Sequence, residues 1–232
     1  LSFEGLDGAP GENGSDARGV FDDIGKDGER GYGGYNGSRG SNVRLFVQPA
    51  VVSGDTLLRI LARSPDRTEK LVIDPQGGKL YLDCRGGSGG MGGRGGDGAN
   101  VGSGIGGDGG HGGQGGNGGR GGKVTIYTDS LGLPYLSAIT VLNNGGQAGL
   151  GGGGGRCGSG GSDIDYDGHW LAVLLGIIAE AALTSGSDGK EGITGTPGNN
   201  GAKPTVRVLS SKKLQRYVRR AEARANRSGA AN

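Results

Sequence analysis

The sequence has little of what an ordinary globular core needs. Only 32% of its 232 residues are hydrophobic and 5% are aromatic. Proline is scarce as well, with 7 residues, which argues against collagen, because collagen combines one glycine per triplet with abundant proline. The composition therefore favours neither a globular domain with an ordinary hydrophobic core nor a collagen triple helix.

Cysteine and net charge are also in short supply. Cys84 and Cys157 stand alone, so they form neither a disulfide framework nor a zinc-binding spacing. Lys and Arg number 25 against 23 Asp and Glu, and the net charge of +2 gives no general electrostatic argument for nucleic acid. Signal-peptide and membrane-span patterns are not visible, so we expect no membrane span.

Glycine is what the chain has in excess, with 59 residues. In Gly86–Gly122 it fills two of every three positions over most of the stretch. A period of three fits neither an α-helix nor a strand, but it is the period of the left-handed polyproline-II type of helix. The alternative interpretation is that the glycine blocks are disordered, because glycine loses much backbone entropy when it becomes ordered. The strict phase of the triplets favours polyglycine-II helices that hydrogen bond to one another across their bare faces.

The triplet period recurs in six blocks, of which the four longest have 16 or 17 residues, roughly 50 Å at about 3.1 Å per residue. The blocks are 5–14, 25–40, 86–98, 106–122, 145–161 and 186–201. Similar lengths suit a bundle. We expect the three blocks rich in paired glycine (86–98, 106–122 and 145–161) to lie centrally and the other three outside.

Between the blocks lie segments with strand patterns. Residues 42–84 hold four such runs separated by turn signals, which predicts a small antiparallel β unit. Further strands are expected at 123–129, 138–143 and 204–209, with one helical turn at 133–136. The predicted fold class is mainly irregular and β, with a bundle of about six polyglycine-II helices. We expect one domain over 1–209, followed by a basic helix and tail over 210–232.

Gly115–Asp129, GGNGGRGGKVTIYTD, carries a family resemblance. It resembles the glycine-rich domain of Obg-type GTPases, in which a glycine repeat runs into a strand and six polyglycine-II helices sit on a β unit. More loosely, the chain is similar to other polyglycine-II proteins of bacteria and phages. No P-loop is present, because Gly122-Lys123 is followed by Val124 rather than Ser or Thr, so GTPase activity is not implied. The bacterial cytoplasm and cell surface both fit the resemblance.

Two features lie in the interruption at 163–184. Asp163, Asp165 and Asp167 form the first half of an EF-hand-like calcium loop, although Leu174 replaces the expected glutamate. The alternative is an acidic start to the helix that follows, favoured by the helix dipole. The run Trp170–Leu183 is apolar on all sides and must be buried, either as a cap on the bundle or as a subunit interface. Its candidate interface residues are Trp170, Leu171, Val173, Leu174, Ile177 and Ile178.

The predicted C-terminal helix is strongly basic around a narrow apolar stripe. Its candidate contact residues are Lys212, Lys213, Arg216, Arg219, Arg220 and Arg224. Such a face suits an acidic partner, a membrane surface or nucleic acid, and the alternative is a solvated charged face.

Catalytic arrangements are not recognisable, and His111 and His169 lie in different segments. We therefore expect a non-enzymatic scaffold without a cofactor that self-assembles or docks to a protein partner. One alternative is an adhesin-like recognition module with contacts in loops near 99–105, 143–150 and 163–169. A second is an ice-binding protein, although the decorated rows carry Arg, Asp, Met and His rather than the Thr or Ala of a flat ice face.

Overall fold

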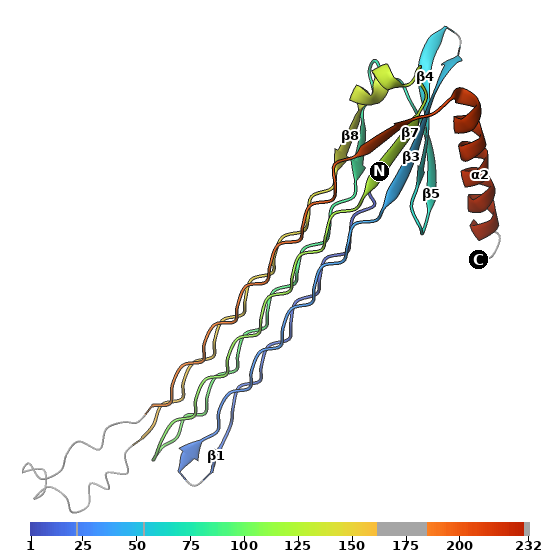
Figure 1. Cartoon of the computed structure of the whole chain (residues 1–232). Helices are drawn as coiled ribbons and strands as arrows, with labels where there is room; N and C mark the ends of the chain where they lie inside the picture. Colours follow the sequence, from blue (N-terminus) through green and yellow to red (C-terminus); the bar gives the residue numbers. More distant parts are fainter. Residues whose placement is uncertain (22, 53, 162–184, 230–232) are drawn as a thin grey trace, which may run out of the picture.

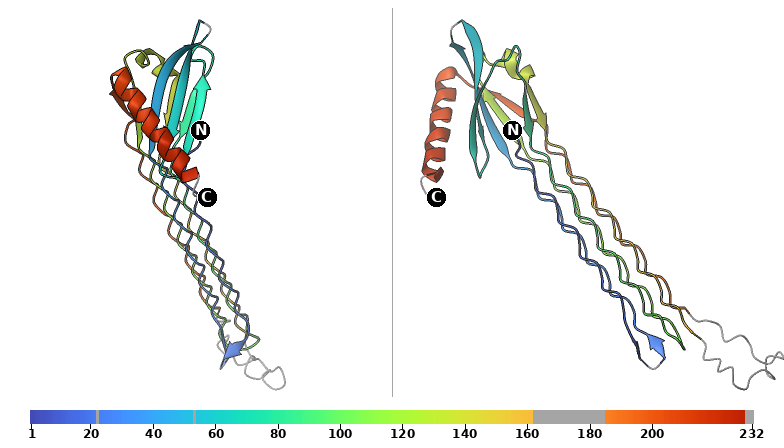
Figure 2. Two further views of the ribbon diagram at one scale, coloured as in Figure 1. Left: turned by 90° about the vertical axis from the view of Figure 1, so that its right-hand side faces the viewer. Right: turned by 180° about the vertical axis from the view of Figure 1, so that it is seen from behind.

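The computed structural model describes residues 1–21, 23–52, 54–161 and 185–229. The molecule consists of a small head and a long, narrow shaft (Figures 1 and 2). The head contains most of the β-strands and the helix α2, and the shaft contains extended segments that lie side by side along their whole length. The predicted calcium and interface residues in 163–178 lie outside the described residues.

The shaft contains six extended segments, and the chain passes down and up it three times. We name them S1 (3–17), S2 (26–42), S3 (84–101), S4 (106–123), S5 (143–160) and S6 (185–204). S1, S3 and S5 run away from the head, and S2, S4 and S6 return to it (Figure 1). At the far end, the short strands β1 (Val20–Phe21) and β2 (Ile24–Gly25) form a hairpin between S1 and S2.

Hydrogen bonds between segments recur at every third residue. Gly8 N donates to Ser88 O at 2.7 Å, and the same pattern continues at Gly11 and Gly14. The parallel contacts define two rows, S1–S3–S5 and S2–S4–S6, and antiparallel bonds join the rows. S3 and S4 occupy the middle of their rows. S5, which we expected to be central as well, lies at the end of its row and bonds to S3, S4 and S6.

Glycine is needed in this packing because neighbouring backbones occupy the space of a side chain. A Cβ at Gly113, in the middle of S4, would overlap the carbonyl oxygen of Tyr32. Gly113 N donates to Gly93 O at 2.8 Å, while the adjacent Gly112 N donates to Lys190 O, also at 2.8 Å. Two bare faces thus let one segment bond to two neighbours, and this explains the paired glycines of S3 and S4.

The main sheet of the head has five strands in the order β5-β4-β3-β7-β9. They are β3 (Val43–Val52), β4 (Asp55–Arg63), β5 (Thr68–Ile73), β7 (Val124–Thr128) and β9 (Thr205–Val208). The first three pair antiparallel, but β7 and β9 pair parallel. The antiparallel pairing predicted within 42–84 is confirmed for β3, β4 and β5, but the fourth predicted strand, at 79–84, is not part of this sheet, and β7 and β9 extend the sheet in parallel. S2, S4 and S6 return in one direction, so the strands that continue them must lie parallel.

A second, two-stranded sheet lies over the main one. It pairs β6 (Leu80–Asp83) with β8 (Ile139–Leu142) in parallel, and these strands lead into S3 and S5. The 3-10 helix η1 (Leu133–Ala138) precedes β8, at the place where a helical turn was predicted. Residues 143–150 begin S5 and bond within the shaft, so the expected loop there is wrong.

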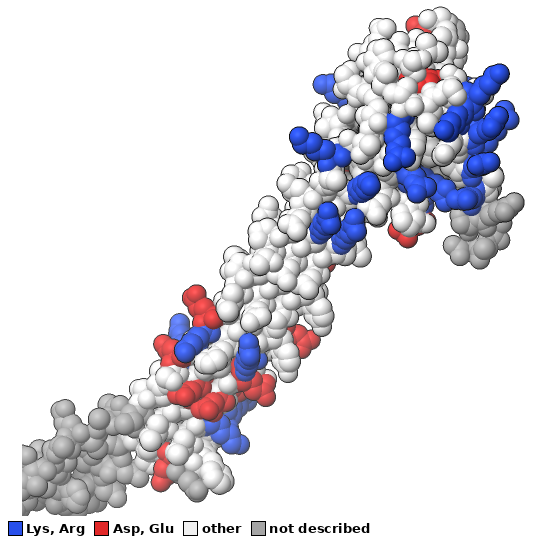
Figure 3. All heavy atoms as spheres, viewed as in Figure 1, with Lys and Arg blue, Asp and Glu red and all other residues white. Residues whose placement is uncertain are grey.

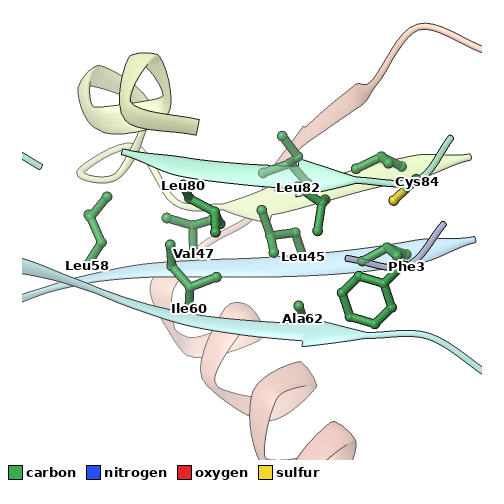
Figure 4. Close-up of a cluster of buried hydrophobic side chains, with 12 residues drawn as sticks. Phe3, Leu45, Val47, Leu58, Ile60, Ala62, Leu80, Leu82 and Cys84 are labelled. Carbon is green, nitrogen blue, oxygen red and sulfur yellow. The ribbon is translucent and has the colours of Figure 1, made fainter. Parts of the chain in front are cut away.

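The principal hydrophobic core fills the space between the two sheets. Figure 4 shows Leu45 and Val47 of β3 facing Leu80 and Leu82 of β6, and Phe3 contributes from the start of the chain. This core follows from the alternating pattern of β3, in which Val43, Leu45 and Val47 point to one face.

The opposite face of the main sheet packs against α2 (Ser211–Gly229). Leu214 and Ala221 of α2 are buried against Phe46 and Leu61 of the sheet. The head therefore has three layers, and the basic helix covers one of its faces.

Candidate functional site: a basic groove on the head

Charge is distributed unevenly along the molecule. Lys and Arg gather over the head around α2 and the neighbouring end of the shaft, whereas the distal shaft carries most of the visible Asp and Glu (Figure 3). Residues 201–224 alone contain eight Lys and Arg and one acid, Glu222. The net charge of the whole chain is close to zero, but the head is strongly basic.

A groove of about 540 Å³ crosses the α2-covered face of the main sheet at its shaft end. Its lining includes four cationic residues, Arg44, Arg63, Lys123 and Arg207, and it includes no Asp or Glu. Arg44 of β3 lies directly opposite Arg63 of β4 in the strand register. The fold therefore collects positive charge from four separate parts of the chain.

These four side chains are not neutralised within the part of the chain that the structure describes. The ion pairs found there join other cations, such as Lys70 to Glu222 at 2.9 Å. Like charges that lie directly opposite on neighbouring strands destabilise a sheet. The Arg44–Arg63 pair is thus a local cost that none of these ion pairs offsets.

Aromatic rings connect the groove to α2. Tyr127 lines the groove and stacks on Phe46, with 5.1 Å between ring centroids. Tyr127 also stacks on Tyr217 of α2, with 6.0 Å between ring centroids. Tyr217 is 39% exposed and lines a second hollow together with Lys213, Arg216 and Arg220. We call the two hollows together the basic surface.

The predicted basic contact residues all lie on α2, but they divide between its two sides. Lys212, Lys213, Arg216 and Arg220 border the hollow around Tyr217. Arg219 lines a different groove with Phe46, Leu61 and Glu222. Arg224 is exposed one turn beyond Arg220 and has a contact of its own.

Sequence reasoning missed the sheet contribution to this surface. Arg44, Arg63, Lys123 and Arg207 are far apart in the chain and none belongs to a charge run. The available signal was the alternation in β3 and β4, where Arg44 and Arg63 occupy the face opposite the core. Because the strand order was not predictable, their juxtaposition was not either.

The shaft uses its third-position side chains for structure. Asp108 Oδ1 accepts from Ser187 N at 2.6 Å, and Asp108 N in turn donates to Asp27 Oδ1 at 2.8 Å. Asn117 repeats this arrangement between Asn36 and Thr196. These side chains accept hydrogen bonds from the backbone N–H groups of third-position residues, which do not take part in the hydrogen bonds of the glycines.

Hydrogen bonds of this kind lower the pKa of three carboxyl groups in the shaft. The backbone N–H of Arg156 lowers the pKa of Asp97 below its ordinary value of 3.8. The N–H groups of Ser187 and Cys157 likewise lower the pKa values of Asp108 and Asp188. These acids are therefore anchored in the shaft as carboxylates.

Other predicted candidates do not form a reactive centre. His111 Nδ1 accepts from Lys190 N at 3.2 Å on the shaft surface. Cys84 lies in the head core, where burial raises its pKa to about 12, and Cys157 lies in the shaft; both are free thiols. Among the described residues, His, Cys, Asp and Glu do not gather into a group of three or more that could hold a metal.

In the same described ranges, the helices are too short or too polar to cross a membrane. Comparison with protein-family models, with curated proteins and with solved structures found no match for this chain.

Proposed function

We propose that this chain is a non-enzymatic scaffold in which a bundle of polyglycine-II helices acts as a rigid spacer. The spacer holds the basic head away from the far end of the molecule, at a distance of roughly 50 Å for segments of this length at about 3.1 Å per residue. The residues at the two ends make the contacts, through assembly with other copies or docking to a protein partner.

The observation that carries this proposal is the ladder of hydrogen bonds between segments. Gly110 N donates to Gly96 O at 2.8 Å, Gly155 N to Gly110 O at 2.8 Å, and Gly189 N to Gly155 O at 2.9 Å, so one level crosses four segments. Each glycine amide that is bonded in this way ties two segments in a fixed register. A shaft cross-linked at every third residue resists bending far better than a flexible glycine linker.

The resemblance to Obg-type domains supports the same architecture, since strands that run directly into glycine segments characterise both. The absence of a P-loop keeps GTPase activity outside the proposal.

The test is solution mass and shape, measured by light scattering and small-angle X-ray scattering. The intact chain is compared with a variant in which residues 163–184 are replaced by a short Gly-Ser linker. We expect an elongated particle in both cases, and a defined oligomer only for the intact chain.

A compact or expanded-coil scattering profile contradicts the rigid spacer. If both proteins are elongated monomers, the spacer stands but self-assembly fails. In that case, docking to a protein partner or the adhesin-like recognition module replaces self-assembly in the proposal.

A further inference from the structure

The cations of the basic surface lie close together and form no ion pair within the part of the chain that the structure describes. Some other cations of the head do have partners: Arg85 bonds Asp83 at 2.7 Å, and Arg67 lies over the Phe3 ring at 4.4 Å. In the groove, Arg44 and Arg63 oppose each other, the lining holds no Asp or Glu, and neither residue forms an ion pair with a described carboxylate. Where a local cost has no internal compensation, an external ligand is a physical explanation.

We propose that the basic surface binds single-stranded nucleic acid, with phosphates on the groove cations and a base stacked on Tyr217. Three observations carry this inference: the clustered unpaired cations, the concave site, and the exposed aromatic ring beside them. Cations that follow a backbone, with aromatic rings for the bases, are the general features of single-strand binding.

The register supplies a suitable spacing. Arg63, Arg44 and Thr125 form one row across β4, β3 and β7, and Tyr127 and Arg207 belong to the next row towards α2. Neighbouring strands lie about 4.8 Å apart and successive residues on one face about 6.8 Å apart. A strand of phosphates can thus meet several cations while its bases reach the Tyr127–Tyr217 stack.

Other anionic partners fit less well. A duplex keeps its bases stacked inside, so Tyr217 would have no base to contact. A flat lipid surface does not follow the concave lining of the groove. The acids on the distal shaft of a second copy, such as Asp97 and Asp108, already accept backbone hydrogen bonds.

This inference goes beyond the proposed scaffold role and depends only on the head. The experiment measures fluorescence anisotropy of a labelled oligothymidylate of about 20 nucleotides, longer than the site sizes typical of single-strand binding folds. The full chain is compared with the double variant Arg44→Ala/Arg63→Ala. The matched control, Arg30→Ala/Lys79→Ala, removes the same charge away from the groove.

We expect the groove variant to lose at least about tenfold in affinity and the control to lose less than about twofold. If four phosphates are neutralised, affinity should fall roughly 50-fold between about 50 and 200 mM salt, because single strands lose about 0.7 logarithmic units per phosphate and tenfold salt. Neither variant should melt below the parent protein. In the groove variant, removal of the opposed Arg44–Arg63 charges also takes away a repulsion that destabilises the sheet.

A second variant tests the bases separately. Tyr217→Leu retains an apolar side chain against Tyr127 but removes the exposed ring, and we expect roughly a fivefold or greater loss for oligothymidylate, since base stacking is worth about 1–3 kcal/mol. An abasic oligomer of equal length should bind the parent more weakly and should not respond to Tyr217→Leu.

Four results overturn the proposal: no binding at low salt, equal loss in the control variant, equal affinity for the abasic oligomer, or tighter binding of polyglutamate or of phosphatidylserine vesicles. The last two assign the surface to anions in general, to an acidic protein or to a membrane.

Discussion

Individual glycines of the shaft differ in what they do, although the sequence makes them look alike. Gly152 and Gly153 are neighbours in S5. A Cβ at Gly152 would overlap the carbonyl oxygen of Gly93, whereas a Cβ at Gly153 would meet nothing within 4 Å. Glycine is thus a packing requirement at the first position and a freely replaceable residue at the second.

We predict that Gly152→Ala lowers the free energy of unfolding by about 2 kcal/mol or more, because overpacking a close contact costs about 1–3 kcal/mol and the hydrogen bond from Gly152 N to Gly113 O is displaced as well. Gly153→Ala should be neutral or stabilising by up to about 1 kcal/mol, because alanine reduces the entropy of the unfolded chain. Chemical denaturation of both variants measures the difference, and equal effects would contradict the packing argument.

Third-position side chains also differ. Asn117 Oδ1 accepts from both the N and the Oγ of Thr196, at 2.7 and 2.9 Å, while Gln114, one triplet earlier, has no such bond among the described contacts. We predict that Asn117→Ala destabilises the protein by about 1 kcal/mol, the usual net contribution of one hydrogen bond. Gln114→Ala should change stability by less than about 0.5 kcal/mol. Thermal melts of the two variants show whether the third-position side chains stabilise the shaft or only lie on its surface.

At the scale of elements, the sheets and the shaft share one register. Asn36 and Asn117 are 81 residues apart, and so are Thr128 and Val47, which are joined by a side-chain hydrogen bond in the head. Val43 also pairs with Val124 in β3 and β7. The parallel strands thus set the levels at which the glycine segments meet, and S2 and S4 continue that alignment.

The carboxylates of the shaft predict an acid-sensitive element. The pKa values of Asp97, Asp108 and Asp188 are lowered by backbone hydrogen bonds, so their contribution to stability is present above the unfolded value of 3.8 and is lost as pH falls through the lower folded values. We expect a constant melting temperature above about pH 5 and a decline below about pH 4.

The matched variant replaces all three residues by Asn, which keeps the oxygen acceptor and removes the titration. Its melting temperature should fall less steeply in acid than that of the parent. An identical decline in both proteins would show that these carboxylates do not carry the effect.

The helix α2 is held by a few apolar residues. Leu214 is fully buried, and we predict that Leu214→Ala costs about 2–4 kcal/mol and loosens α2 from the sheet. Lys212→Ala, on an exposed position of the same turn, should have little effect. Hydrogen exchange of the α2 amides measures the loosening, and unchanged exchange in Leu214→Ala would contradict the three-layered head.

The elements were more predictable than their arrangement. The alternation in β3 and the turn signals before and after β5 placed the strands, because local patterns determine which residues extend and which face is apolar. The parallel pairing of β7 and β9 depends on the direction in which S4 and S6 return, which is a long-range property. For the same reason, Lys212–Arg220 were recognised as a basic run, whereas the meeting of Arg44 with Arg63 was not.

At the scale of the whole molecule, each glycine block is ordered by its contacts with the other blocks. Glycine-rich chains are ordinarily flexible, and the entropy lost on ordering them is large. Contacts between segments must offset that loss, since the shaft has few apolar side chains to bury. The amides of S3 and S4 must therefore be hydrogen bonded in solution.

Residue-resolved amide hydrogen exchange of S3 and S4 tests this claim most directly. We predict strong protection at both glycines of each triplet, for example at Gly112 and Gly113, whose amides bond to S6 and S3. Exchange across 86–122 at the rate of an unstructured glycine-rich peptide would contradict the bonded shaft, and with it the rigid spacer.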